Sequence, residues 1–334
     1  LYSTKELNID YSKFENHTFF DSAVSKTNIA FDRVVNLFPF DKSRQDVANF
    51  KENSTGFEDY IIKSFPKNKG YLHFISDSSH FITVKDMTGY LYSAESEKRT
   101  SMPVFSPFNS GLTVEFWLKI PNQTHEEMSV AQIIDTQRAG YAISVSGSSG
   151  DTCKVMFTML SGSVSHTIST PIYKDKFNLV TSVFDSTKNI MKLYVNSSLA
   201  ITSSAIDFKT LEMRNTDLII GSGSQFLENS TESSYFNPMT TLTGAIDEFR
   251  YYHGAKSIDS IEMTKFSPTY QNDEINLDLI TYFKFNEPPG SYTGNNLVLD
   301  YSGNNLHSEI SNFTSEARLT SSIGNSPLTK ENIK

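Results

Sequence analysis

The stretch GLTVEFWLKI, residues 111–120, has the pattern of a β-strand with two different faces. Side chains of a strand point alternately to opposite sides, so every second residue shares a face. One face then carries the apolar residues Val114, Phe116, Leu118 and Ile120. The opposite face carries Glu115, Trp117 and Lys119. We expect the first face to line a core between two sheets and the second to be amphipathic.

The same period of two continues on both sides of this strand. Turn-forming stretches separate the segments, as in SGSSGD at 146–151 and DSTKN at 185–189. Many short strands at this spacing indicate an antiparallel sandwich, and the lack of helical patterns between them disfavours a parallel sheet. The predicted strands are 71–75, 81–85, 112–120, 131–136, 141–146, 154–160, 164–170, 177–184, 190–195, 199–203, 217–221 and 242–252.

The stretch GAIDEFRYY, residues 244–252, departs from strict alternation. Ile246 and Phe249 are both apolar but lie three positions apart, so a regular strand would place them on opposite faces. A β-bulge at Asp247–Glu248 resolves this, because a bulge adds one residue to a strand. We predict this bulge, with Asp247 accepting hydrogen bonds and Arg250 as its local partner, in a structural and not a catalytic role.

Composition and charge exclude several classes of protein. The net charge is −9, which disfavours nucleic acid as a partner, because phosphate binding requires clustered Lys and Arg. No run of about 18 uncharged apolar residues occurs, so no membrane span is expected. The single cysteine, Cys153, rules out an internal disulfide and a cysteine-based zinc site. The 25 Phe and 16 Tyr residues suit the half-buried surfaces of a β-rich protein.

The first 69 residues follow a helical pattern instead. Val24, Phe31, Val34 and Phe38 recur at helical spacing, with Asp21 before them as a candidate N-cap and Pro39 after them as a stop. Short helices with an apolar face are stable only when that face is buried. We expect residues 1–69 to form a helical arm, which either packs on the following domain or docks into a larger assembly.

The strand motifs resemble the concanavalin A-like lectin superfamily, in its laminin G-like branch. The resemblance implies an all-β, antiparallel jelly-roll sandwich over residues 70–268, with a short helical region before it. One departure is Asn196-Ser197, which stands where the family usually has Asn/Asp-Gly. The matching stretches are GLTVEFWLKI (111–120), IIDTQRAGYAISVSG (133–147), FNLVTSVFDSTKNIMKLYVNSSLA (177–200), LIIGSG (218–223) and LTGAIDEFRYYHGAKSIDSIEM (242–263).

A partial second match follows the sandwich. DLITYFKFNEPPG (278–290) and LVLDYSGNNLHSEI (297–310) are similar to the opening strands of the same family. Residues 269–334 are too few for a second complete sandwich. These strands therefore either complete the first sandwich, which we expect, or begin a truncated second copy.

The arm resembles the N-terminal regions of large structural proteins of tailed bacteriophages. The stretches that carry this likeness are FDSAVSKTNIAFDRVVNLFPFD (20–41) and TGFEDYIIKSFPKNKGYLHF (55–74). The resemblance implies a non-enzymatic virion protein of the tail, baseplate, fibre or head decoration. Its partners would be other virion proteins or copies of itself, and a host-surface glycan. The alternatives are a secreted or surface carbohydrate-binding module, located outside the cell, and a glycoside hydrolase of the same fold.

Catalytic and metal chemistry find little support in the residues. Glycoside hydrolysis requires two carboxylates that flank one bond, and Glu115 is alone in its strand. We therefore predict no catalytic residues, no cofactor and no metal. Calcium remains a weaker alternative, because Asp135, Asp151 and Asp185 lie near loops, but no dense acidic loop surrounds them.

Aromatic residues are the candidates for carbohydrate contact, because sugars stack on exposed rings. The polar segment SQFLENSTESSYFNP, residues 224–238, contributes three of them, and the strand at 112–120 contributes one. In the competing interpretation Trp117 is covered by the arm and the other rings cover an edge of the core. The candidates are Trp117, Phe226, Tyr235 and Phe236.

Overall fold

A computed structural model describes most of the chain after residue 69. The predicted arm, with Val24, Phe31, Val34 and Phe38, lies outside the described residues. Within the described part no helix is long and apolar enough to span a membrane. The described ranges are 70–86, 92–93, 98–99, 104–122, 127–147, 150–208, 210–214, 216–265, 278–287, 295–304 and 306–319.

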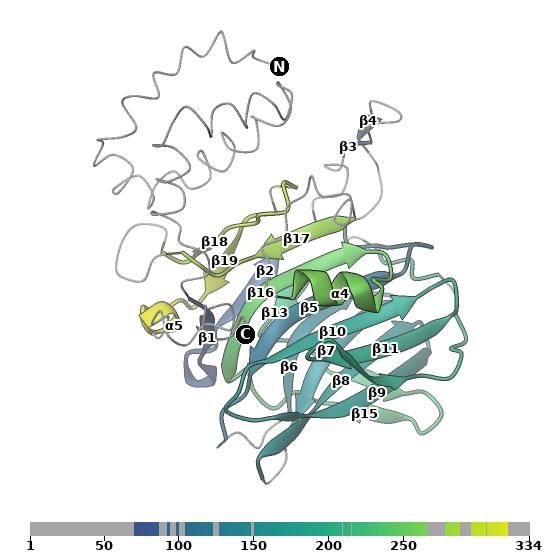
Figure 1. Cartoon of the computed structure of the whole chain (residues 1–334), viewed down its shortest axis with the longest axis horizontal. Helices are drawn as coiled ribbons and strands as arrows, with labels where there is room; N and C mark the ends of the chain where they lie inside the picture. The colour runs from purple at the N-terminus through teal and green to yellow at the C-terminus, as the bar shows by residue number, and fades with distance from the viewer. Residues whose placement is uncertain are drawn as a thin grey trace.

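Two antiparallel sheets stack to form a sandwich (Figure 1). In pairing order, the first sheet contains β12 (Ser198–Thr202), β11 (Ile190–Val195), β10 (Asn178–Asp185), β5 (Leu112–Lys119) and β16 (Gly244–His253). Two further strands, β1 (Leu72–Phe74) and β17 (Leu279–Phe283), both pair with β16. The second sheet contains β18 (Leu297–Val298), β19 (Ser308–Ser311), β2 (Phe81–Val84), β13 (Leu218–Ile220), β6 (Met128–Ile134), β7 (Gly140–Ser146), β8 (Thr152–Ser161) and β9 (Val164–Tyr173). The predicted fold class is confirmed.

The remaining elements are short. Two hairpins pair β3 (Tyr92–Ser93) with β4 (Lys98–Arg99) and β14 (Phe226–Asn229) with β15 (Ser234–Phe236). The helical elements are η2 (Ser76–Ser78), α4 (Ile258–Thr264) and α5 (Glu316–Leu319). The hairpin β14–β15 and the helix α4 are not among the predicted elements.

The core lies between the two sheets, as the alternation of β5 predicts. Val114, Phe116, Leu118 and Ile120 all belong to the main apolar cluster, whereas Trp117 belongs to a separate cluster on the other face. The ring of Phe116 stacks on Phe249 of the neighbouring strand, with 5.7 Å between ring centroids. The two strands therefore meet through an aromatic pair on their inner faces.

The predicted bulge in β16 is present. The register between β16 and β5 shifts between Asp247 and Arg250, and Glu248 has a φ of +52°, in the left-handed region. The side chain of Asp247 accepts the backbone N–H of Glu248 at 2.9 Å, as predicted for that carboxylate. The bulge lets Ile246 and Phe249 both enter the main core cluster.

Strands from residues 278–311 enter both sheets. β17 pairs with β16, opposite residues Phe249 to Tyr252, and β19 pairs with β2. Asp300 closes the turn before β19, because its buried carboxylate accepts the backbone N–H groups of Tyr282, Ser302 and Leu306 at 2.9, 3.0 and 2.9 Å. Hydrogen bonds of this number satisfy a buried carboxylate that has been removed from water.

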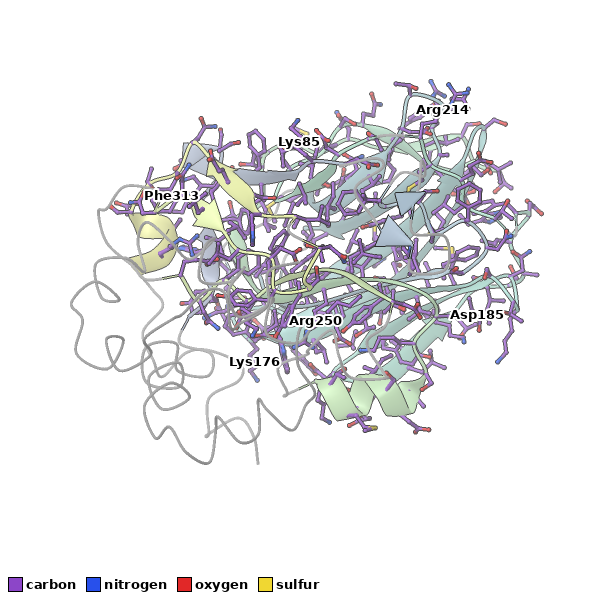
Figure 2. The ribbon with its side chains drawn as sticks, turned by 90° about the horizontal axis from the view of Figure 1, so that it is seen from above. Lys85, Lys176, Asp185, Arg214, Arg250 and Phe313 are labelled. Carbon is purple, nitrogen blue, oxygen red and sulfur yellow. The ribbon has the colours of Figure 1, made fainter. Side chains whose placement is uncertain are left out.

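The outer face of the first sheet carries a buried network of charges around Arg250. The guanidinium donates to Glu115 Oε1 at 2.9 Å and to Glu248 Oε2 at 2.6 Å. It also donates to the carbonyl oxygen of Thr264, at the end of α4, at 3.1 Å. The hydroxyl of Tyr282 donates to the same carboxylate oxygen of Glu248. Figure 2 shows Arg250 among the strands of the sandwich.

Lys256 completes the network. Its ammonium group lies 3.6 Å from Glu115 Oε1 and donates to Thr264 Oγ1 at 2.7 Å. Burial lowers the pKa of Lys256, the charge of Glu115 opposes this, and the charge of Arg250 adds to it. Two cations and two carboxylates are thus balanced beneath α4, which lies across this sheet (Figure 1).

Removing the buried cation at the centre of this network should therefore lower the free energy of unfolding far more than removing an exposed cation. Arg250→Met leaves Glu115 and Glu248 buried without their shared partner, and we expect the free energy of unfolding in urea to fall by about 3–5 kcal/mol. Arg214→Met, at an exposed arginine, should change it by less than about 0.5 kcal/mol. Adding Glu248→Gln to Arg250→Met should restore part of the loss. Equal stabilities for the two single variants would show that the network does not hold the sheet.

Candidate functional site

The hairpin β14–β15 covers part of the outer face of the second sheet. The rings of Phe226 and Phe236 stack on each other with 5.0 Å between centroids and an angle of 23°. They form a buried cluster with Ala142, Met156 and Leu160 of β7 and β8. The hairpin is therefore anchored to the sheet by an apolar contact of its own, separate from the main core.

Polar contacts fix the hairpin at its two ends. Gln132 of β6 accepts the backbone N–H of Ser224 at 2.6 Å and donates to the carbonyl oxygen of the same residue at 3.0 Å. At the other end, Thr167 Oγ1 of β9 donates to the carbonyl oxygen of Glu228 at 2.5 Å. The segment is thus held on the sheet from β6 to β9, and residues on its outer side have a fixed position.

Tyr235 is the exposed aromatic residue of this hairpin, which we call the platform. Its side chain is 52% exposed, while its neighbour Phe236 is 1% exposed. Tyr235 lies opposite Leu227 in the hairpin register, next to the inward pair Phe226 and Phe236. Successive residues of a strand point to opposite sides, so the ring that anchors the hairpin and the ring offered to solvent are neighbours in sequence.

Carboxylates gather around Glu228 of the hairpin. Partial burial raises the pKa of Glu228, and the negative charges of Glu127 and Glu232 raise it further. These residues come from the segment before β6, from β14 and from the tip of the hairpin. The surface around the hairpin therefore has a negative potential, and its carboxylate oxygens can accept hydrogen bonds from hydroxyl groups.

The four aromatic candidates from the sequence separate into one exposed and three buried residues. Trp117 is 7% exposed and packs with Leu179, Tyr194 and Ile261. Among the described residues, Ile261 of α4 is part of this cover, whereas the competing interpretation assigned the cover to the arm, which lies outside the described residues. Phe226 and Phe236 are buried beneath the hairpin. Of the four, Tyr235 presents its ring to solvent in this structure.

Glu115 and Glu248 lie closer together than the sequence indicated. They come from neighbouring strands and share the guanidinium of Arg250, because the bulge turns Glu248 to the outer face. Both side chains are buried, at 1% and 2% exposure. Carboxylates held in this way are neutralised by a fixed cation, and a polysaccharide chain has no access to them in this arrangement.

The aspartates considered for calcium are engaged in turns. Asp135 accepts the backbone N–H groups of Gln137, Ala139 and Arg214 at 2.8, 2.8 and 2.9 Å. Asp185 pairs with Lys192 at 2.9 Å. Asp151 is exposed in the turn before β8. Across the described residues, no group of three or more His, Cys, Asp or Glu side chains is arranged to hold a metal ion.

Two features of the site were not predicted, for different reasons. The signal for the hairpin was present, since Phe226 and Leu227 are apolar, as are Tyr235 and Phe236, and the polar stretch between them is typical of a turn. The gathering of Glu127 near Glu228 had no local signal. The two residues are distant in sequence, and the charge of one acts on the other because the hairpin folds onto the second sheet.

The chain belongs to the concanavalin A-like lectin/glucanases superfamily, whose laminin G-type family model matches residues 59–262. No curated protein matches the sequence at a significant level. The superfamily includes both binding proteins and enzymes by its name, so the family alone defines a lectin-like fold and leaves the activity to the site.

Solved structures with a similar fold are distant in sequence. A putative carbohydrate binding protein from Bacteroides ovatus has 14% identity and a TM-score of 0.48, covering 73% of this chain and 58% of its own. A pentraxin from Limulus polyphemus has 14% identity and a TM-score of 0.40, covering 57% and 79%. The CBM40 of a Ruminococcus gnavus sialidase, bound to α2,3-sialyllactose, has 14% identity and a TM-score of 0.39, covering 58% of this chain and 96% of its own. This chain thus spans 58% of the length of the Bacteroides protein.

The two adjacent aromatic residues of β15 should respond differently to truncation. Phe236→Ala removes a fully buried ring that anchors the hairpin, and we expect the free energy of unfolding to fall by about 3–5 kcal/mol. Tyr235→Ala removes an exposed ring, and the change should stay within about 0.5 kcal/mol. Urea unfolding of both variants measures the difference. A large loss for Tyr235→Ala would mean that this ring is structural and not free for a ligand.

Proposed function

We propose that this chain is a non-enzymatic carbohydrate-binding module whose contact residue is Tyr235. The observation that carries the proposal is an exposed ring on a hairpin that is anchored beneath by Phe226 and Phe236. A ring held in place loses little conformational entropy when a sugar stacks on it. The membership of the lectin superfamily supports the same function.

The charges around the hairpin favour a neutral glycan. Glu127, Glu228 and Glu232 repel an anionic sugar such as a sialic acid or a uronic acid, and their oxygens accept hydrogen bonds from neutral hydroxyl groups. The ligand class proposed here therefore differs from the sialyllactose found in the Ruminococcus module. Among neutral glycans, a surface-displayed polysaccharide suits a platform that is open to solvent.

The absence of catalysis is part of the proposal. Glu115 and Glu248 are close to each other, but both are buried and both bind the guanidinium of Arg250. A glycosidase requires one carboxylic acid that can donate a proton to the leaving group and a second carboxylate that can reach the sugar. The geometry around Arg250 supports a structural role for this pair.

Binding of the purified chain to a panel of neutral and anionic glycans tests this function. We expect measurable affinity for at least one neutral glycan, a loss of about 5-fold to 100-fold in Tyr235→Ala, and no reducing ends released from any glycan. Tyr173→Ala is the matched control, because this tyrosine is 61% exposed at the last position of β9, whereas the hairpin contacts that strand near Thr167. Equal loss in both variants, or binding that survives Tyr235→Ala unchanged, would contradict the assignment.

We further propose that the module serves in a virion, as part of a phage tail, baseplate, fibre or head decoration. The support is the resemblance of residues 20–41 and 55–74 to phage structural proteins, together with the apolar stripe of the arm. The partners would be other virion proteins or copies of this chain. The alternative location is extracellular, as a secreted or surface-attached module.

The arm should mediate contacts between chains. In the full-length chain, Phe31→Ser with Phe38→Ser removes two apolar residues of the stripe, and we expect a defined oligomer in sedimentation velocity to shift toward monomer. The thermal unfolding of the sandwich should remain unchanged. A wild-type chain that sediments as a monomer with the same shape as the variant would contradict docking through the arm between copies.

A further inference from the structure

The segment formed by β19 and α5, residues 308–319, closes against β1 and β2 at one end of the sandwich (Figure 1). β19 pairs with β2, with Ile310 opposite Ile82, and Ala317 of α5 is fully buried in the main core cluster. We call residues 308–319 the clasp. Phe313, between the two elements, lies beside α5 in Figure 2.

Two side-chain contacts join the clasp to the start of β2. Asn312 Nδ2 donates to the carbonyl oxygen of Ser79 at 3.1 Å. The imidazole Nε2 of His80 lies 3.2 Å from Thr314 Oγ1, within hydrogen-bonding distance. His80 is 1% exposed and Thr314 is half-buried, so the imidazole side of this contact is shielded from solvent. A proton added to this ring would place a charge inside the junction.

The surroundings of His80 decide how it responds to acid. Burial lowers the pKa of His80, against the opposing effects of the backbones of His73 and Asn312 and of the charge of Glu316 on α5. Burial also lowers the pKa of His73 on β1, and the charges of His80 and of Lys119 on β5 lower it further. The two imidazoles therefore disfavour each other's protonation, and Glu316 is the acidic group that acts in the opposite direction.

The lowered pKa values of His73 and His80 make the closed clasp less stable in acid. Both histidines have a lower pKa in the folded clasp than the value of about 6.5 expected in an unfolded chain. The folded form therefore binds fewer protons than the open form below that pH, and its stability falls as the pH falls. At neutral pH and above, both rings are uncharged and this destabilisation is absent.

We propose that the clasp is an acid-labile closure, which opens from β1 and β2 together with its edge partner β18 when the pH falls below about 6.5, while the rest of the sandwich stays folded. Opening would separate Thr314 from His80 and unpair β19 from β2. The edge of β2 would then be available to another strand. Opening would also break the buried ion pair in which Arg318 of the clasp donates to Glu287 Oε2 at 2.5 Å.

Hydrogen–deuterium exchange of the full-length chain tests this proposal at about pH 7.5 and about pH 5.0, with exchange times scaled to the intrinsic chemical rates. Peptides within residues 306–319 are compared with peptides of β8 as an internal reference. We expect protection of the clasp to fall at the lower pH by at least about tenfold more than that of β8. An equal fall in both segments would overturn the proposal, because acid would then act on the whole fold.

Variants separate His80 from the other histidines. His80→Gln keeps a polar side chain but cannot titrate, so the extra loss of protection in acid should disappear. His166→Gln, on β9 beside Asp207, is the control and should retain it. If His80→Gln does not fold, His73→Gln carries the test, because removing one titrating ring should make the pH dependence less steep. A full acid response in the folded His80→Gln protein, or an unchanged slope in His73→Gln, would overturn the proposal.

Discussion

The guanidinium of Arg250 is the interaction on which the first sheet depends. It joins the carboxylate of Glu115 on β5, the carboxylate of Glu248 in the bulge of β16 and the last carbonyl group of α4. A slip of one residue between β5 and β16 would turn these charges into the apolar core, where an unpaired ion is costly. The network therefore fixes the strand register, the need for the bulge and the position of the helix.

The sequence predicted the sandwich well because its signals were local. Alternation in β5 placed Val114 and Phe116 in the core, and the mismatch between Ile246 and Phe249 located the bulge. The partners of Arg250 were only partly predicted. Asp247 was the expected partner, yet the carboxylates that bind the guanidinium at the closest distances come from Glu248 and Glu115. Glu248 is a partner of Arg250 because its backbone is left-handed. Two adjacent acidic residues in a sequence do not show which of them will adopt that conformation.

The sequence located the segment of the candidate site but not which of its aromatic rings are exposed. Residues 224–238 were identified as a polar segment with aromatic candidates, and the segment does form the platform. Which of its rings face solvent depends on tertiary contacts. Phe226 and Phe236 are buried because Ala142, Met156 and Leu160 of the second sheet offer them an apolar surface, and this surface is assembled from two other strands.

The path of the chain through the two sheets has a consequence for synthesis on the ribosome. β1 and β2 are among the first strands of the sandwich to be made, and β2 receives its partner β19 only after residue 311 has been added. β17 likewise reaches β16 late. Contacts this distant in sequence form slowly, and strand edges that wait for a partner are prone to aggregate. The emerging chain therefore keeps two incomplete sheets until almost all of the described sandwich has been translated, and a chaperone that covers open edges would benefit it most during that interval.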